Sequence, residues 1–60
     1  MPDQERWAEA WQIHRWKGEE APLFVAERIG ALALADDQAG VIRFKEIAER
    51  LDQIRRGVRH

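Results

Sequence analysis

An almost entirely apolar segment occupies the middle of this 60-residue chain. Between Pro22 and Ala35 the only charged side chains are those of Glu27 and Arg28. On a helix of about 3.6 residues per turn these two lie on one side, and apolar side chains cover the remaining arc. Such a helix is roughly 21 Å long, too short to cross a bilayer. The segment therefore predicts a central helix with neighbours on more than one face.

The small size of the chain limits how it can be stabilised. Sixty residues form at most one domain, so we expect a single helical domain over 1–60 with a small core. Without cysteine there is no disulfide, and with His14 and His60 as the only histidines no metal site or cofactor is expected. Tight helix packing and self-association remain as the means of support.

Periodicity predicts two further helices, over residues 3–17 and 38–56, beside the central one at 22–35. Their apolar stripes, including Ile47 and Leu51, face one direction while charged side chains face the other. The predicted fold is all-α, a compact three-helix bundle in which the segment 22–35 is central and antiparallel to the first helix.

Three local features support these boundaries. Gly18 suits the end of the first helix and Pro22 the first position of the second. One of the aspartates Asp36 and Asp37 is expected to cap the last helix. Within the last helix, ion pairs at i,i+4 spacing are expected. These are Glu46 with Arg50 and Asp52 with Arg56.

Gly30 lies inside the central segment, where glycine costs about 1 kcal/mol relative to alanine. We expect a compensating close approach of another helix, helped by the small side chains of Ala26 and Ala33. Gly30→Leu is accordingly predicted to disrupt packing by overfilling.

Several segments together resemble a family of very short bacterial proteins classed as a domain of unknown function. The most specific is the run Ala-Glu-Arg-Ile-Gly-Ala-Leu-Ala at 26–33. The others are Glu5-Arg-Trp7, Ala21-Pro-Leu-Phe-Val25, Ala39-Gly-Val41 and Ile47-Ala-Glu-Arg-Leu51. The resemblance covers most of the chain and supports a helical fold. It implies no activity and no site residues.

Catalysis is not expected. The chain has no serine, threonine, cysteine or tyrosine, which removes the usual nucleophiles and hydroxyl donors. His14 and Glu9 are five residues apart and point in directions about 140° apart on a helix. We therefore predict no catalytic residues and no small-molecule substrate, with His14 at the edge of the core beside Trp7 and Trp11.

Aromatic side chains are the candidate residues for a protein interface, because tryptophan is frequent at interface hot spots. Trp7 and Trp11 share a stripe with core residues, so core packing also accounts for them. Trp16 falls on the opposite side. Either the helix unwinds before Lys17 and Gly18, so that Trp16 folds back onto the core, or Trp16 is exposed and contacts another chain. Phe24 completes the candidate interface. The expected partner is a second copy, giving a homodimer, or another protein.

The C-terminal region offers an alternative, a nucleic-acid-binding accessory protein. Residues 41–60 hold six basic and three acidic side chains. The candidate phosphate contacts are Arg50, Arg55, Arg56 and Arg59. The carboxylates dilute this patch, and a helix-turn-helix interpretation fails because Asp36 and Asp37 would meet phosphate.

These observations favour a small non-enzymatic helical protein that acts as a protein-interaction or self-associating scaffold module. The acidic start of the chain lacks the features of a signal peptide, so a cytoplasmic protein with no membrane segment is expected.

Overall fold

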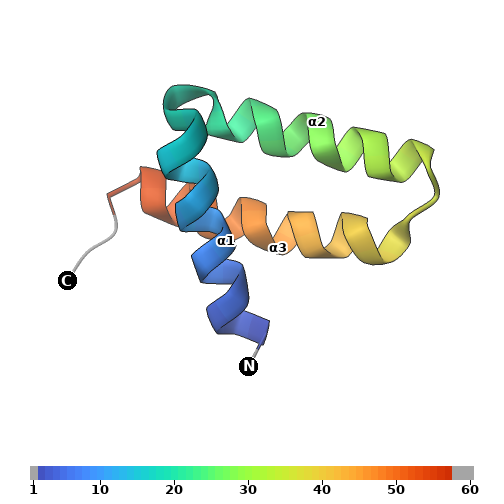
Figure 1. Cartoon of the computed structure of the whole chain (residues 1–60), viewed down its shortest axis with the longest axis horizontal. Helices are drawn as coiled ribbons and strands as arrows, with labels where there is room; N and C mark the ends of the chain where they lie inside the picture. The colour runs from blue at the N-terminus through green and yellow to red at the C-terminus, as the bar shows by residue number, and fades with distance from the viewer. Residues whose placement is uncertain (1, 58–60) are drawn as a thin grey trace.

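The computed structural model describes residues 2–57, and every regular element in this range is helical (Figure 1). Helix α1 spans Pro2–Lys17, the 3₁₀ turn η1 spans Gly18–Glu20, α2 spans Ala21–Leu34 and α3 spans Gln38–Arg55. The helix ends agree with the predicted ones to within one residue. The all-α prediction is therefore confirmed, and no helix in the described range is both long and apolar enough to cross a membrane.

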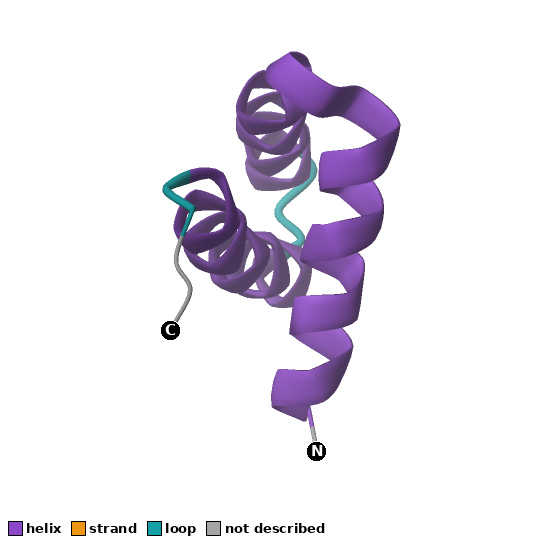
Figure 2. Ribbon diagram, turned by 90° about the vertical axis from the view of Figure 1, so that its left-hand side faces the viewer, coloured by secondary structure: helices purple, strands orange, loops and turns teal. Residues whose placement is uncertain are grey.

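The middle helix is α3. Helices α2 and α3 run antiparallel side by side, and α1 crosses one face of this pair near the end where α2 begins (Figures 1 and 2). Both α1 and α2 pack along α3, while α1 and α2 share little contact beyond the turn that joins them. The prediction that 22–35 is central and antiparallel to the first helix is wrong, and the three helices do not form a clear three-helix bundle.

The charged side chains of α1 pair with α3 in this arrangement. Asp3, Arg6 and Glu9 all find partners of opposite charge on α3. Helix α2 carries only Glu27 and Arg28, so it cannot offer a comparable set of partners. The apolar content of α2 suggested a central position, but both ion pairs and the buried Ala10 join α1 to α3.

The core lies where the three helices meet. Its fully buried side chains are Ala10 of α1, Ala21 and Val25 of α2, and Ile47 and Leu51 of α3. A second layer of partly buried apolar side chains packs against them: Ile13, Phe24, Ile29, Phe44, Ala48 and Ile54. Because α3 supplies the two largest members of the buried cluster, the whole fold depends on its apolar stripe.

The turn between α2 and α3 is built around Asp37, one of the two aspartates expected to cap the last helix. Its side chain accepts a 2.9 Å hydrogen bond from the Gly40 amide, which caps α3. A Cβ atom on Gly40 would lie only 2.8 Å from Asp37 Oδ2 and 3.1 Å from Leu32 Cδ2. The absence of a side chain at Gly40 therefore permits both the cap and close packing of Leu32.

Gly30 lies on the outside of the molecule. A Cβ atom built there meets no other group within 4 Å. The predicted close approach of another helix to Gly30, and the overfilling expected for Gly30→Leu, are therefore wrong for the single chain. The helix that packs on α2 contacts its opposite side, where Val25 lies.

Candidate interaction surfaces

Two of the four predicted interface residues meet at the junction of α1 and α2. The rings of Trp16 and Phe24 pack edge to face with centroids 5.2 Å apart. Lys17 Nζ lies 4.2 Å from the Trp16 ring centroid and 5.1 Å from that of Phe24. Trp16 is nevertheless 67% exposed. The prediction that Trp16 points away from the stripe of Trp7 and Trp11 thus agrees with its exposed position.

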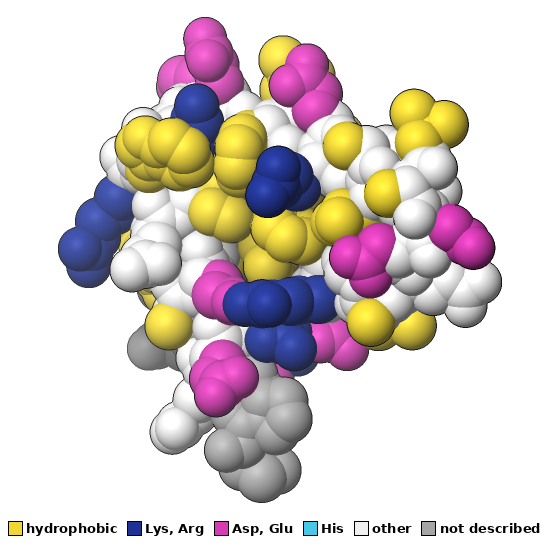
Figure 3. All heavy atoms as spheres, turned by 45° about the vertical axis from the view of Figure 1, so that its right-hand side comes forward, with side chains coloured by type: hydrophobic (Ala, Val, Ile, Leu, Met, Phe, Trp, Pro, Cys, Tyr) yellow, Lys and Arg dark blue, Asp and Glu magenta, His cyan; other side chains and the backbone are white. Residues whose placement is uncertain are grey.

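We call the surface around this pair the aromatic corner, formed by Ile13, Trp16, Lys17, Phe24 and Arg28. Shallow depressions border it, one lined by Ile13 and Trp16 and another by Phe24 and Arg28. Figure 3 shows apolar side chains gathered in the angle between α1 and the α2–α3 pair, with Lys and Arg side chains beside them. The surface combines apolar side chains with the cations of Lys17 and Arg28, and the carboxylate of Glu27 borders it.

Trp7 and Trp11 lie elsewhere on α1. Trp7 is partly buried, and the Arg50 guanidinium carbon lies 5.9 Å from its ring centroid. Trp11 is 47% exposed and packs edge-on to His14 at 5.7 Å. Core packing therefore accounts for Trp11 less well than the sequence suggested, while His14 lies beside it as expected. The four predicted interface residues do not form one patch.

The arginines of the nucleic-acid alternative are engaged within the chain. Arg50 pairs with Asp3 and donates to the Glu46 carbonyl oxygen. Arg55 donates a 3.2 Å hydrogen bond to the Gly18 carbonyl oxygen, and Arg56 pairs with Asp52 at 3.0 Å. Arg59 lies outside the described residues. These contacts leave the described part of the basic region with little unpaired charge.

Ion pairs between α1 and α3 are the feature that sequence reasoning missed. Arg6 Nε donates to Glu46 Oε1 at 3.0 Å, so the predicted side-chain pair of Glu46 with Arg50 does not form. Glu9 accepts from Arg6 and Arg43. These partners are up to 47 positions apart in the chain, so no local spacing rule reveals them. The predicted pair of Asp52 with Arg56 is present.

The same contacts shift the ionisation of the groups involved. The hydrogen bond from Arg43 holds the pKa of Glu9 below its ordinary value of 4.5, although partial burial opposes the change. The hydrogen bond to Glu9 raises the pKa of Arg43, and the hydrogen bond to Asp3 raises that of Arg50. The joint between α1 and α3 is therefore ionic as well as apolar.

The side of α2 that faces away from α3 is apolar and exposed. Leu34 is 92% exposed and Leu23 59% exposed. We call this surface the α2 outer face. It consists of Leu23, Ala26, Gly30, Ala33 and Leu34, which share an arc of about 100° on a helix. Glu27 lies at its edge. The sequence signal for this face is the all-round apolar pattern of α2, which predicts neighbours on more than one face.

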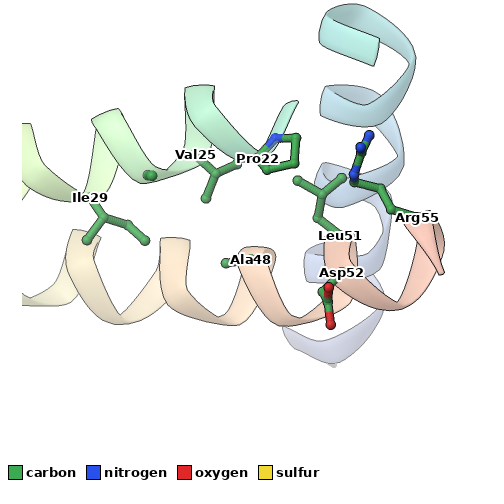
Figure 4. Close-up of a pocket in the computed structure, with 8 residues that line it drawn as sticks. Pro22, Val25, Ile29, Ala48, Leu51, Asp52 and Arg55 are labelled. Carbon is green, nitrogen blue, oxygen red and sulfur yellow. The ribbon is translucent and has the colours of Figure 1, made fainter. Parts of the chain in front are cut away.

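A groove adjoins the α2 outer face on the side of the α2–α3 pair away from α1. Its volume is about 270 Å³. It is lined by Pro22, Val25, Ala26, Ile29, Ala48, Leu51, Asp52 and Arg55 (Figure 4). Because Ala26 belongs to both surfaces, the groove extends the exposed apolar area from α2 onto α3. Asp52 and Arg55 are its polar rim.

Potential catalytic and metal-binding groups are dispersed. Within residues 2–57 no three histidine or acidic side chains converge to hold a metal ion. His14 Nδ1 is enclosed without a hydrogen-bond partner in this range. Its neighbour is the Trp11 ring rather than a carboxylate.

Comparison of the sequence with known proteins identifies a family and nothing more specific. No curated protein and no solved structure matches the chain. A family model described as a family of unknown function (DUF6961) matches residues 2–58, nearly the whole chain. The chain therefore belongs to this family of unknown function.

Proposed function

We propose that this protein is a small non-enzymatic interaction module that associates with a second copy of itself through the α2 outer face. The single observation that carries the proposal is the position of Leu34, a large apolar side chain that is 92% exposed beside other apolar residues of the same face. Contiguous exposed apolar surface of this kind is typical of interaction sites.

Gly30 supports a helix as the occupant of this face. A glycine in a helix interior costs about 1 kcal/mol relative to alanine, and no contact within the described chain compensates for that cost. The neighbouring side chains of Ala26 and Ala33 are also small. Close approach of a helix from a second copy would use the flat surface that these three residues create.

Charge favours an antiparallel arrangement of the two α2 helices. Within α2 the carboxylate at the edge of the face is that of Glu27, and Asp36 and Asp37 follow at the C-terminal end of the helix, beside Ala33. A parallel pair would bring the two Glu27 side chains to the same level and align the helix dipoles unfavourably. An antiparallel pair centred near Gly30 separates the carboxylates and opposes the dipoles.

The proposal of a non-enzymatic role draws support from the charged groups. Carboxylates of α1 are paired with arginines, and His14 is packed on Trp11. The chain also lacks hydroxyl and thiol nucleophiles. These features suit a structural or interaction role.

Sedimentation equilibrium of the wild type and of Leu34→Glu tests the proposal. One helix face is a small interface, so we expect a dissociation constant in roughly the micromolar range. Leu34→Glu places a charge in the interface and should weaken association by about tenfold or more, with unchanged helicity by circular dichroism.

The matched control is Trp11→Glu, which also introduces a carboxylate in place of an exposed apolar side chain, but on α1. We expect its association to equal that of the wild type. A strictly monomeric wild type would refute self-association. A dimer that survives Leu34→Glu and dissociates in Trp11→Glu would place the interface on α1 and contradict the proposal.

A further inference from the structure

We infer that the aromatic corner is a second interaction surface and that it binds an acidic amphipathic helix of another protein. The inference goes beyond self-association and uses different residues. The corner is formed by Ile13, Trp16, Lys17, Phe24 and Arg28, whereas the α2 outer face contains none of these.

The aromatic side chains provide a rigid apolar contact area. Edge-to-face packing of Trp16 on Phe24 restricts both rings, while 67% of Trp16 stays exposed. Phe24 is in turn anchored, because it packs against the buried cluster. A large apolar side chain held in place loses little conformational freedom on binding, which is what an interface hot spot requires.

Two cations next to these rings have no carboxylate partner. Lys17 lies over both rings, and Arg28 lines the same depression as Phe24. In the part of the chain that the structure describes, no ion pair joins either residue to an acidic group, although Glu27 borders the same depression. This contrasts with Arg43 and Arg50, whose charges are paired with Glu9 and Asp3.

Complementary chemistry defines the partner. Apolar side chains at i, i+3 and i+4 of a helix suit the contact with Ile13, Trp16 and Phe24, and carboxylates flanking that stripe suit Lys17 and Arg28. A protein helix is favoured over single-stranded nucleic acid, because two unpaired cations neutralise few phosphates. Figure 3 shows the apolar area and the adjacent basic groups on one face of the molecule.

A pair of designed peptides tests the inference. Both carry leucine at the stripe positions of an amphipathic helix, one with glutamate and the other with lysine at every remaining position. Calorimetric titration measures affinity, and indole N–H resonances report which tryptophan is contacted. We expect the acidic peptide alone to bind, with perturbation of the Trp16 resonance and with an affinity that falls as salt is added.

Charge reversal by Arg28→Glu should weaken binding roughly tenfold. The matched control is Arg15→Glu, an exposed arginine on α1 outside the corner, which should bind as the wild type does. Trp16→Ala should weaken binding by roughly thirtyfold, the effect of losing a hot-spot tryptophan. Circular dichroism verifies that each variant remains folded.

Several outcomes overturn the inference. These are equal binding of the acidic and basic peptides, no binding of either, equal loss in Arg15→Glu and Arg28→Glu, or preferential binding of a single-stranded oligonucleotide or of anionic vesicles. Repeating the titration with Leu34→Glu separates the two proposals. Peptide binding by this variant supports the aromatic corner whether or not the chain self-associates.

Discussion

Helices α1 and α2 are attached to α3 in different ways. Where α2 packs on α3, Val25 and Leu51 are buried, and Ile29 and Phe44 pack against the cluster to which they belong. The joint between α1 and α3 contains Ala10 together with charged side chains that pair across the two helices. The stability of the contact between α2 and α3 should therefore depend on apolar side-chain volume. The stability of the contact between α1 and α3 should also depend on pH and salt.

The difference also determines which surfaces remain open. Charge pairing uses the polar groups of α1 and leaves Trp16 at its C-terminal end exposed. Helix α2 buries only one side of its apolar surface against α3, so the opposite side is exposed to solvent. An apolar helix in a small protein can thus be a peripheral element whose free side serves association.

The largest effect is expected from Leu51→Ala. Leu51 is 2% exposed and belongs to the buried cluster, so truncation should lower the free energy of unfolding by about 2–5 kcal/mol. Total stability of a chain this small is roughly 3–9 kcal/mol, so the loss is a large share of it. Urea unfolding followed by circular dichroism measures the change.

Leu34→Ala provides the matched control for this variant. Leu34 is 92% exposed, so the same substitution should change stability by no more than about 0.5 kcal/mol at concentrations below self-association. Equal destabilisation by the two variants would mean that α2 is covered on both sides, as the sequence pattern suggested.

Two glycine-to-alanine variants should act in opposite directions. In Gly30→Ala the new methyl group meets no neighbour, so higher helix propensity should stabilise the monomer by about 0.5–1 kcal/mol. In Gly40→Ala the methyl group displaces the Asp37 carboxylate from the amide that it caps, which should cost about 1 kcal/mol. Thermal unfolding of both variants measures the difference, and a less stable Gly30→Ala would indicate a neighbour at that position within the chain.

The smallest effect on stability is expected from the ion pairs between α1 and α3. Because the pKa of Glu9 is lowered in the folded chain, its stabilising contribution is complete above the ordinary pKa of 4.5 and disappears as the pH falls through the lower folded value. Glu9→Gln should therefore unfold with a weaker dependence on pH below about 4.5 than the wild type. Melting temperatures between neutral and acidic pH measure this.

Glu27→Gln is the control for the acid dependence, since no ion pair joins Glu27 to a basic group in the described range. Its pH profile should follow that of the wild type. High salt should reduce the difference between the wild type and Glu9→Gln, because most of these charges are partly exposed to solvent. Identical pH profiles for the wild type and Glu9→Gln would show that the joint between α1 and α3 is apolar alone.

Local features of the fold could be predicted from the sequence, and the arrangement of the helices could not. Apolar periodicity located the helices, and Asp37 was identifiable as a possible cap because a capping aspartate acts within three residues. Which helix lies between the other two involves contacts such as that of Arg6 with Glu46, which are 40 positions apart in the chain. A wide apolar arc on α2 indicates that it has uncovered surface to bury, but it does not specify which chain covers it.

The candidate surfaces, too, could be predicted from the sequence only in part. Helical phase placed Trp16 opposite the stripe of Trp7, since that angle follows from the helix alone. It did not decide between exposure and folding back onto the core, and the structure shows Trp16 exposed. Its contact with Phe24 depends on how η1 turns the chain between α1 and α2, which no periodicity specifies. The pairing of Arg50 with Asp3 likewise required the crossing of α1 over α3.

The central claim is that α3 lies between α1 and α2. Methyl nuclear Overhauser effects within one chain, separated from those between chains by isotope filtering of a mixed labelled sample, test it most directly. We expect the methyl groups of Ile47 and Leu51 to show effects to Ala10 on one side and Val25 on the other, with none linking Leu34 to α1. Effects from the Leu34 methyl groups to α1, or from methyl groups of α1 to the Gly30 α protons, within the same chain and without those from α3 to Ala10, would contradict it.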